Sequence, residues 1–263
     1  MVQRTAMPLK KVQVNIPFPM LLENLEHILA MGIQPEVYFS GLTLDRLPWK
    51  DVQKASRKLE EKNTSVTFHA PFMDLSPGSV DEKIRQVTAF RFNQVMELVP
   101  YFQPRAIVFH AGYDRWRFDS DVNLWLENSL SIWRTLAERA EAHSVRLALE
   151  NVYEENPSIL GKLLEAIHSP YVGFCLDAGH GHIFSQVPVR EWIEVLGSHL
   201  IEIHLHDNHR QADEHLPPGF GEIDFPSIFV TLQGKNFKPI YTLEPHQREH
   251  LEPSLKAIEK YLG

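Results

Sequence analysis

Short apolar runs alternate with longer amphipathic segments along the whole chain, and this alternation restricts the possible folds more than any other feature. Eight runs rich in β-branched and other apolar residues are predicted to be strands. They are residues 12–16, 36–39, 65–69, 106–110, 146–150, 172–177, 200–206 and 240–244. Strands that alternate with helices in this way are typical of a parallel sheet in an α/β protein.

The helical spacing is clearest between the fourth and fifth predicted strands. Apolar residues recur there at steps of three or four, namely Val122, Leu126, Leu130, Trp133, Ala137 and Ala140. Ser120 precedes this stripe and Asn156-Pro157 precedes the next helical segment. Both are expected to begin helices, because such side chains accept a free backbone N–H and proline fits the first turn.

Two folds produce this alternation, a closed (β/α)8 barrel and an open doubly wound sheet. The second usually carries Gly-x-Gly-x-x-Gly after its first strand, but Asn15-Ile16-Pro17-Phe18-Pro19 stands at that position here. No linker or change of composition divides the 263 residues. The sequence therefore predicts an α/β protein that forms one (β/α)8 TIM barrel domain over residues 1–263.

Charge and cysteine content restrict the partners and the compartment. The chain has 26 Lys and Arg against 34 Asp and Glu, a net charge of −8 that gives no general attraction to DNA phosphates, so nucleic acid is not the expected partner. Its one cysteine, Cys175, cannot form an intramolecular disulfide, which favours a reducing compartment. No secretory signal or apolar run of ~18 residues is recognisable. We expect a cytoplasmic protein without a membrane partner.

The chain has 14 histidines, and their positions point to the chemistry. Five fall in or beside helical segments, where solvated or half-buried imidazoles are ordinary. The other nine follow or end predicted strands, and they are His69, His110, His180, His182, His204, His206, His209, His215 and His246. In a barrel these positions share the rim that carries the active site.

Carboxylates join these imidazoles at the strand ends, where six consecutive strands finish on a residue that can coordinate a metal. With Asp177-Ala178-Gly179-His180 and Asp213-Glu214-His215, the predicted ligands are His69, His110, Glu150, Asp177, His180, His204, Asp213, His215 and Glu244. Imidazole and carboxylate without thiolate suit Zn or Mn better than Ca. Nine ligands exceed the need of one ion, and they predict a site for one to three ions.

Several short motifs in a fixed order carry a resemblance to a known family. They include His69-Ala70-Pro71, Phe109-His110-Ala111-Gly112, Leu149-Glu150-Asn151, Leu176-Asp177-Ala178-Gly179-His180, His204-Leu205-His206-Asp207-Asn208 and Asp213-Glu214-His215-Leu216. In this order they resemble the xylose isomerase-like TIM barrel superfamily, which includes sugar epimerases and the endonuclease IV type of abasic-site nuclease.

The resemblance to the epimerases implies one metal ion held by Glu150, Asp177, His204 and Glu244. It also implies that Glu150 and Glu244 act as the catalytic acid and base, while His180 and Arg210 orient the substrate. Ketohexose epimerases have a further glutamate six residues after the first ligand, but Asn156 stands there. The substrate expected is a sugar or sugar phosphate, its identity left open.

The resemblance to endonuclease IV supports an alternative. That enzyme type holds three zinc ions with nine ligands, and all nine have counterparts here, which favours phosphoester chemistry by an AP endonuclease or a related multinuclear phosphoesterase. The loops expected after the fifth to seventh strands are shorter than in that enzyme type, which disfavours a DNA substrate. The first hypothesis is a divalent-metal-dependent sugar isomerase or epimerase of carbohydrate metabolism, and a non-catalytic binder is the third. The oligomeric state stays open.

Overall fold

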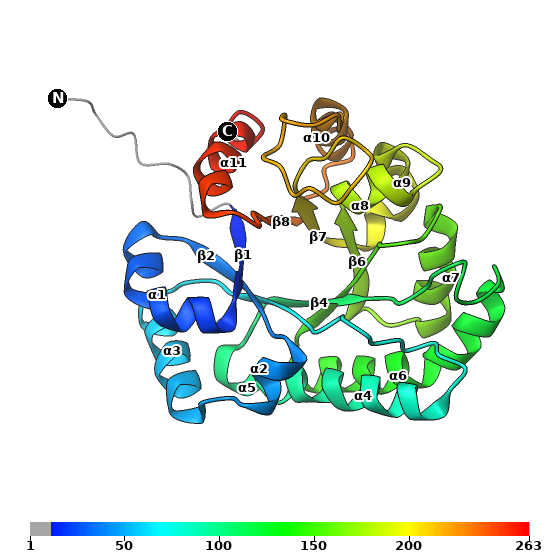
Figure 1. Ribbon diagram of the computed structural model, residues 1–263, viewed down its shortest axis with the longest axis horizontal. Coiled ribbons are helices and arrows are strands. Elements are labelled where there is room, and N and C mark those ends of the chain that lie inside the picture. Colours follow the sequence, from blue (N-terminus) through cyan, green and yellow to red (C-terminus); the bar gives the residue numbers. More distant parts are fainter. Residues whose placement is uncertain (1–11, 263) are drawn as a thin grey trace.

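The computed structural model describes residues 12–262, and its eight strands form one closed parallel barrel (Figure 1). The strands pair in chain order, and the last pairs with the first. They are β1 Gln13–Pro17, β2 Gln34–Tyr38, β3 Thr67–His69, β4 Ala106–His110, β5 Arg146–Glu150, β6 Val172–Asp177, β7 Leu200–Leu205 and β8 Ile240–Leu243. The predicted (β/α)8 TIM barrel is confirmed.

Helices surround this barrel and connect its strands (Figure 1). They are α1 Phe18–Met31, α2 Gly41–Asp45, α3 Trp49–Glu61, α4 Glu82–Met96, α5 Val99–Phe102, α6 Val122–His143, α7 Pro157–Ile167, α8 Ala178–Phe184, α9 Val189–Leu196, the 3-10 turn η2 Gly197–His199, α10 Phe225–Gly234 and α11 Arg248–Glu259. Among residues 12–262, no helix has both the length and the apolar composition that crossing a membrane requires.

The predicted strand boundaries agree with the structure at β4, β5 and β6 and differ by one or two residues elsewhere. At β2 the difference concerns Phe39, which still donates its N–H to the carbonyl oxygen of His69 (3.0 Å) beyond the end of the strand. The predicted domain range of 1–263 includes residues 1–11 and 263, which lie outside the described residues.

One predicted helix start is confirmed and one is wrong. Asn156 caps α7, since its side chain accepts the N–H of Ser158 (3.1 Å). Ser120 does not cap α6. Asp121 does, by accepting the N–H of Leu124 (3.0 Å), while Ser120 takes a left-handed backbone with φ of 61° in the preceding turn.

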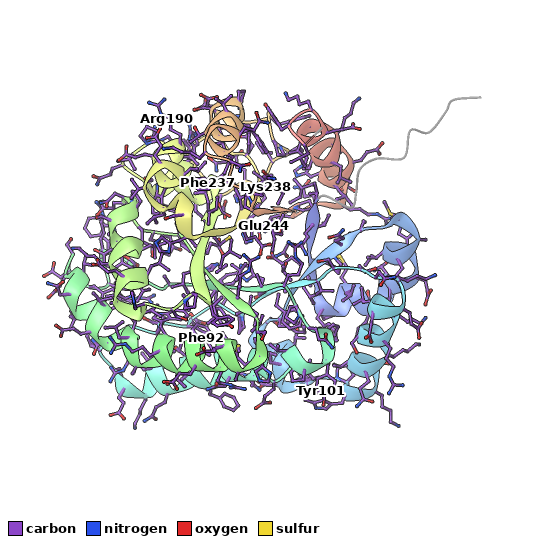
Figure 2. The ribbon with its side chains drawn as sticks, turned by 180° about the vertical axis from the view of Figure 1, so that it is seen from behind. Phe92, Tyr101, Arg190, Phe237, Lys238 and Glu244 are labelled. Carbon is purple, nitrogen blue, oxygen red and sulfur yellow. The ribbon has the colours of Figure 1, made fainter. Side chains whose placement is uncertain are left out.

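Buried polar side chains and a small apolar cluster that includes Val108 and Ala148 share the barrel interior, and the main apolar core lies between the strands and the helices. Phe109 of β4 packs on Phe92 of α4 and Trp133 of α6 with ring centroids 4.8 and 6.0 Å apart. In β7, Glu202 and His204 alternate with the core residue Ile203 because successive side chains of a strand point to opposite faces. Alternation thus directs ionisable side chains toward the barrel axis, and Figure 2 shows Glu244 near the middle of the molecule.

Candidate metal centre

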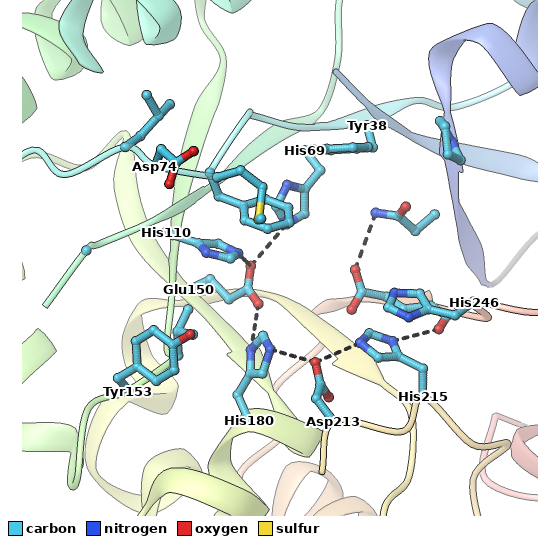
Figure 3. Close-up of a pocket in the computed structure, with 18 of the residues that line it drawn as sticks. Tyr38, His69, Asp74, His110, Glu150, Tyr153, His180, Asp213, His215 and His246 are labelled. Atoms are coloured by element: carbon cyan, nitrogen blue, oxygen red, sulfur yellow. Dashed lines mark hydrogen bonds and ion pairs between the residues drawn. The ribbon is translucent and has the colours of Figure 1, made fainter. Parts of the chain in front are cut away.

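A pocket of about 600 Å³ opens at the carboxyl ends of the strands (Figure 3). Seven of the nine predicted ligands line it, while Asp177 and His204 lie fully buried beneath it. The remaining wall includes aromatic and aliphatic side chains from several rim segments, among them Met20, Tyr38, Phe72, Met73 and Tyr153. All nine predicted ligands therefore converge on one place.

The predicted ligands form overlapping groups. Glu150, at the end of β5, lies at the centre of the first group. Its Oε2 is 3.2 Å from Nε2 of both His69 and His110, and its Oε1 is 3.1 Å from Nδ1 of His180 (Figure 3). The carboxylate is 1% exposed, so protein atoms surround it almost completely. A carboxylate with imidazole nitrogens beside both of its oxygens could help to hold more than one ion.

His204 defines the second group, deeper in the barrel. Its Nδ1 is buried and makes no hydrogen bond. This atom points into a space between three carboxylates, 3.4 Å from Glu244 Oε1 and 3.7 Å from both Glu150 Oε1 and Asp177 Oδ2. An unpartnered imidazole nitrogen surrounded by three carboxylates is a donor set of the kind that Zn binds in proteins.

Asp213 joins the third group from the loop after β7. Its Oδ2 is 3.0 Å from Nε2 of His215 and 3.4 Å from Nε2 of His180 (Figure 3). His215 has a left-handed backbone with φ of 49°, a conformation that is uncommon for a residue with a side chain. The two side chains thus meet in an irregular loop in which His215 has this left-handed backbone.

The hydrogen bonds of the imidazoles give an independent test of whether these residues fit a metal. In proteins, a histidine that ligates a metal usually donates its other ring N–H to a protein oxygen. Four of the predicted ligands do so. Their ring nitrogens donate to the carbonyl oxygens of Ala70 (His69, 2.9 Å), Asn151 (His180, 3.2 Å) and Glu244 (His215, 2.9 Å) and to Glu36 Oε2 (His204, 3.3 Å). Each then turns its second nitrogen toward a carboxylate.

The electrostatics of the cluster keep its central carboxylates ionised. Burial would raise the pKa of Glu150, but the imidazoles of His110 and His204 lower it well below its usual value. Burial is likewise outweighed at Asp177, whose pKa His180 and His206 lower well below the ordinary range. Anionic carboxylates packed this closely need positive charge between them.

The structure places Arg210, and the pair His180 and His182, differently from what the sequence predicted. Arg210 is exposed and lies outside the pocket, in a separate depression that His182 and Glu222 also line. The backbone N–H of Arg210 donates to Asn208 Oδ1 (3.0 Å), and this hydrogen bond holds the turn in place. The geometry therefore does not support the substrate role expected for Arg210. His180 and His182 lie in the helix α8 directly after β6 rather than in a loop.

Three side chains of the site were absent from the predicted set. Glu36 in β2 holds His204, His206 follows β7, and His246 follows β8. The ring of His215 lies between those of His206 and His246, with centroid distances of 3.8 and 3.4 Å. The alternation Glu202, His204, His206 was a usable signal, because three ionisable residues at steps of two share one face of a strand.

Comparison with known sequences agrees with this architecture. The uncharacterized protein MJ1311 of Methanocaldococcus jannaschii is 26% identical over 220 residues, which cover 81% of this chain and 75% of that protein. SgbU of Escherichia coli K12, for which an L-ribulose-5-phosphate 3-epimerase activity has been proposed, is 27% identical over 233 residues, covering 82% and 79%.

Solved structures share the fold across nearly the whole chain. A D-tagatose 3-epimerase-like protein superposes with a TM-score of 0.82 at 24% identity, covering 95% of this chain and 97% of that one. The TTHB071 protein of Thermus thermophilus, studied after soaking with ZnCl2, gives 0.79 at 26% identity with the same coverage. The sequence model described as xylose isomerase-like TIM barrel matches residues 31–261. The chain belongs to the xylose isomerase-like TIM barrel family.

Proposed function

We propose that the protein is a divalent-metal-dependent isomerase or epimerase that moves a proton on a small sugar or sugar phosphate. The observation that carries this proposal is that carboxylate oxygens of both Glu150 and Glu244 lie close to the unpartnered Nδ1 of His204, at 3.7 and 3.4 Å. Both glutamates also line the pocket. Two carboxylates that flank one donor nitrogen can reach opposite faces of a substrate carbon above it.

Zn or Mn is the proposed cofactor, with one to three ions. Glu150, Asp177, His204 and Glu244 would hold the ion nearest the reacting carbon. His69 and His110 with Glu150, and His180 and His215 with Asp213, are the proposed donors for further ions. A bound divalent ion supplies Lewis acidity that polarises the carbonyl and hydroxyl oxygens of a sugar and so acidifies the adjacent C–H.

The two proposed catalytic glutamates have different surroundings. Three imidazoles lie within 3.2 Å of Glu150 oxygens, which restrains that carboxylate. Glu244 accepts a hydrogen bond from Nδ2 of Asn15 (3.3 Å) and its side chain remains 10% exposed, so it is freer to take a proton from carbon. We assign Glu244 the removal of the proton from carbon. Glu150 would return a proton on the opposite face, and it would first have to take one up against the imidazoles that lower its pKa.

The size and charge of the pocket support a small substrate. A volume of about 600 Å³ lies in the range of small-molecule sites, and side chains such as Phe72 and Met20 can shield a sugar ring from water. Among the described residues that line it, Arg117 is the one Lys or Arg, and Asp74 and Asp114 line it as well. This balance favours one sugar or sugar phosphate over a nucleic acid. The cytoplasmic location expected from the single cysteine stays a prediction.

A second candidate follows from the number of donors. The three overlapping groups around Glu150, His204 and Asp213 could hold a cluster of ions that hydrolyses a phosphoester. In that case each ion would be required, since together they position the attacking water and the leaving oxygen.

Metal analysis and one substitution test the first proposal. Protein purified without chelator should contain Zn or Mn, and Glu244→Gln should lower turnover of a sugar substrate by about 10²-fold or more. The matched control is Glu249→Gln, which replaces an exposed carboxylate in the first turn of α11 and should retain full turnover. Metal-free protein that remains fully active would contradict the proposal.

A further inference from the structure

His206 is buried beside the proposed centre and has one ring nitrogen without a partner. The side chain is 1% exposed, and its Nδ1 makes no hydrogen bond. That nitrogen faces Oδ1 of Asp213 at 3.7 Å, too far for a hydrogen bond. The ring also stacks on His215, with centroids 3.8 Å apart and planes inclined by 7°. An unpartnered nitrogen this deeply buried is costly unless something binds it.

The other nitrogen fixes the orientation of the ring. Nε2 lies 3.0 and 3.1 Å from the two carboxylate oxygens of Asp177, which accept hydrogen bonds only, so Nε2 carries a proton. In the neutral ring, Nδ1 therefore presents a lone pair toward Asp213. Two acceptors facing each other without a donor between them leave room for a cation.

We infer that Nδ1 of His206 is a nitrogen donor for the ion held by Asp213 and His215, an assignment that rests on the metal centre of the proposed function. The pattern matches that of the four proposed ligands above, since one ring N–H is held by a protein oxygen and the second nitrogen faces a carboxylate. Ligand-type atoms of His206, Asp213 and His215 all lie within 4.8 Å of one another. This nitrogen-rich set suits Zn²⁺ better than Mg²⁺ or Ca²⁺.

Gly179 provides the space for this ring. A Cβ at position 179 would lie 1.9 Å from Cε1 of His206 and 2.5 Å from Nδ1, closer than any real contact allows. Gly181, two residues further along α8, differs in this respect. A Cβ there would meet its nearest atoms, on Val189 and Asn151, at the ordinary distances of 3.5 and 3.6 Å. The chain therefore offers a way to displace His206 without altering its chemistry, and a matched control for the same helix.

Two substitutions of His206 separate metal binding from support of Asp177. In His206→Gln the side-chain amide reaches the Nε2 position and can still donate to Asp177, but no donor atom replaces Nδ1. In His206→Asn the side-chain oxygen replaces Nδ1 and the hydrogen bond to Asp177 is lost. We expect Gln to weaken the ion at Asp213 at least about tenfold, and Asn to weaken it less.

The experiment is a titration of chelator-treated protein with Zn²⁺ against a competing chromophoric chelator, with bound metal counted by mass spectrometry. His206→Gln and Gly179→Ala should lose affinity at one site and keep the others, while Gly181→Ala should match the unaltered protein. Full affinity in His206→Gln combined with a loss in His206→Asn would overturn the assignment and leave His206 as a support for Asp177. Unaltered protein that binds no Zn²⁺ would instead contradict the metal centre itself.

Discussion

Nε2 of His204 lies 3.3 Å from Oε2 of Glu36, and both side chains are fully buried inside the barrel. Because the carboxylate accepts the ring N–H, it fixes the tautomer that leaves Nδ1 free for a metal. Asn15 extends this support, since its Nδ2 donates to Glu36 (2.7 Å) and to Glu244 (3.3 Å). The position of the proposed ligand His204 and that of the proposed base Glu244 are thereby linked through β1 and β2.

Replacement of Glu36 tests this link. Glu36→Gln should weaken metal binding at His204 by about 10- to 100-fold, because an amide can turn its NH2 toward the ring and no longer selects the tautomer. Glu138→Gln, which replaces an exposed carboxylate of α6 far from this pair in the sequence, is the control. Isothermal titration with Zn²⁺ measures both variants, and equal affinity in the two would contradict the positioning role.

Glu154 should make the stability of the protein depend on pH. Burial raises its pKa to about 7, against backbone hydrogen bonds that lower it. The folded protein therefore retains a proton that the unfolded chain releases near pH 4.5, and the free energy of unfolding falls as the pH rises from about 4.5 to 7 and then levels off.

The variant Glu154→Gln cannot titrate and should escape this loss. Relative to the unaltered protein, its free energy of unfolding should increase by about 1 to 3 kcal/mol between pH 5 and pH 8. Urea unfolding at the two pH values, at equal metal content, measures the difference. Exposed Glu141→Gln is the control and should follow the unaltered protein at both values. If the free energy of unfolding of Glu154→Gln also follows that of the unaltered protein at both pH values, Glu154 is ionised in the folded protein and the prediction is wrong.

The two candidate activities differ in which ligands they require. If one ion acts on a sugar, Glu150→Gln should abolish turnover, whereas His69→Ala should leave measurable activity because His69 serves an auxiliary ion or the substrate. A phosphoesterase should lose nearly all turnover in His69→Ala and His110→Ala as well. Turnover of ketoses, sugar phosphates and abasic duplex DNA should be compared across these variants with metal content recorded. Robust incision of the duplex, lost equally in all of them, would favour the nuclease.

Arg117 should report whether the substrate is phosphorylated. It is the one Lys or Arg among the described residues that line the pocket. A charge-assisted hydrogen bond contributes about 1.5 to 3 kcal/mol, so Arg117→Ala should raise KM for a sugar phosphate about tenfold or more and leave KM for the free sugar unchanged. Steady-state kinetics with a matched pair of substrates measures this, and a uniform change for both would contradict a phosphate contact.

The sequence predicted the barrel and much of the convergence of the nine side chains because the strand positions follow from periodicity. Strand ends of a barrel share one rim, so His69, His110, Glu150 and Asp177 had to lie near one another once the strands were placed. The strand boundaries at β4, β5 and β6 could be placed because polar residues follow the apolar runs there.

The parts that sequence could not supply depend on the conformation of loops and on burial. The position of Arg210 follows from a turn with φ of 61°, which its spacing from His204 does not reveal. Glu36 was placed in a strand but not in the site, since a buried carboxylate is rare and its partner His204 is 168 residues away. His206 was noted at a strand end, but only the three-dimensional structure shows that its Nδ1 lacks a partner.

The most direct test of the proposed function is exchange of solvent deuterium into the substrate. The metal-loaded protein is incubated in D2O with a panel of ketoses and ketose phosphates, and the carbon next to the carbonyl is followed by proton NMR. We predict exchange in at least one member of the panel that chelator abolishes, added Zn or Mn restores, and Glu244→Gln lacks. No exchange into any member, while the same protein hydrolyses a phosphodiester, would contradict the proposed function.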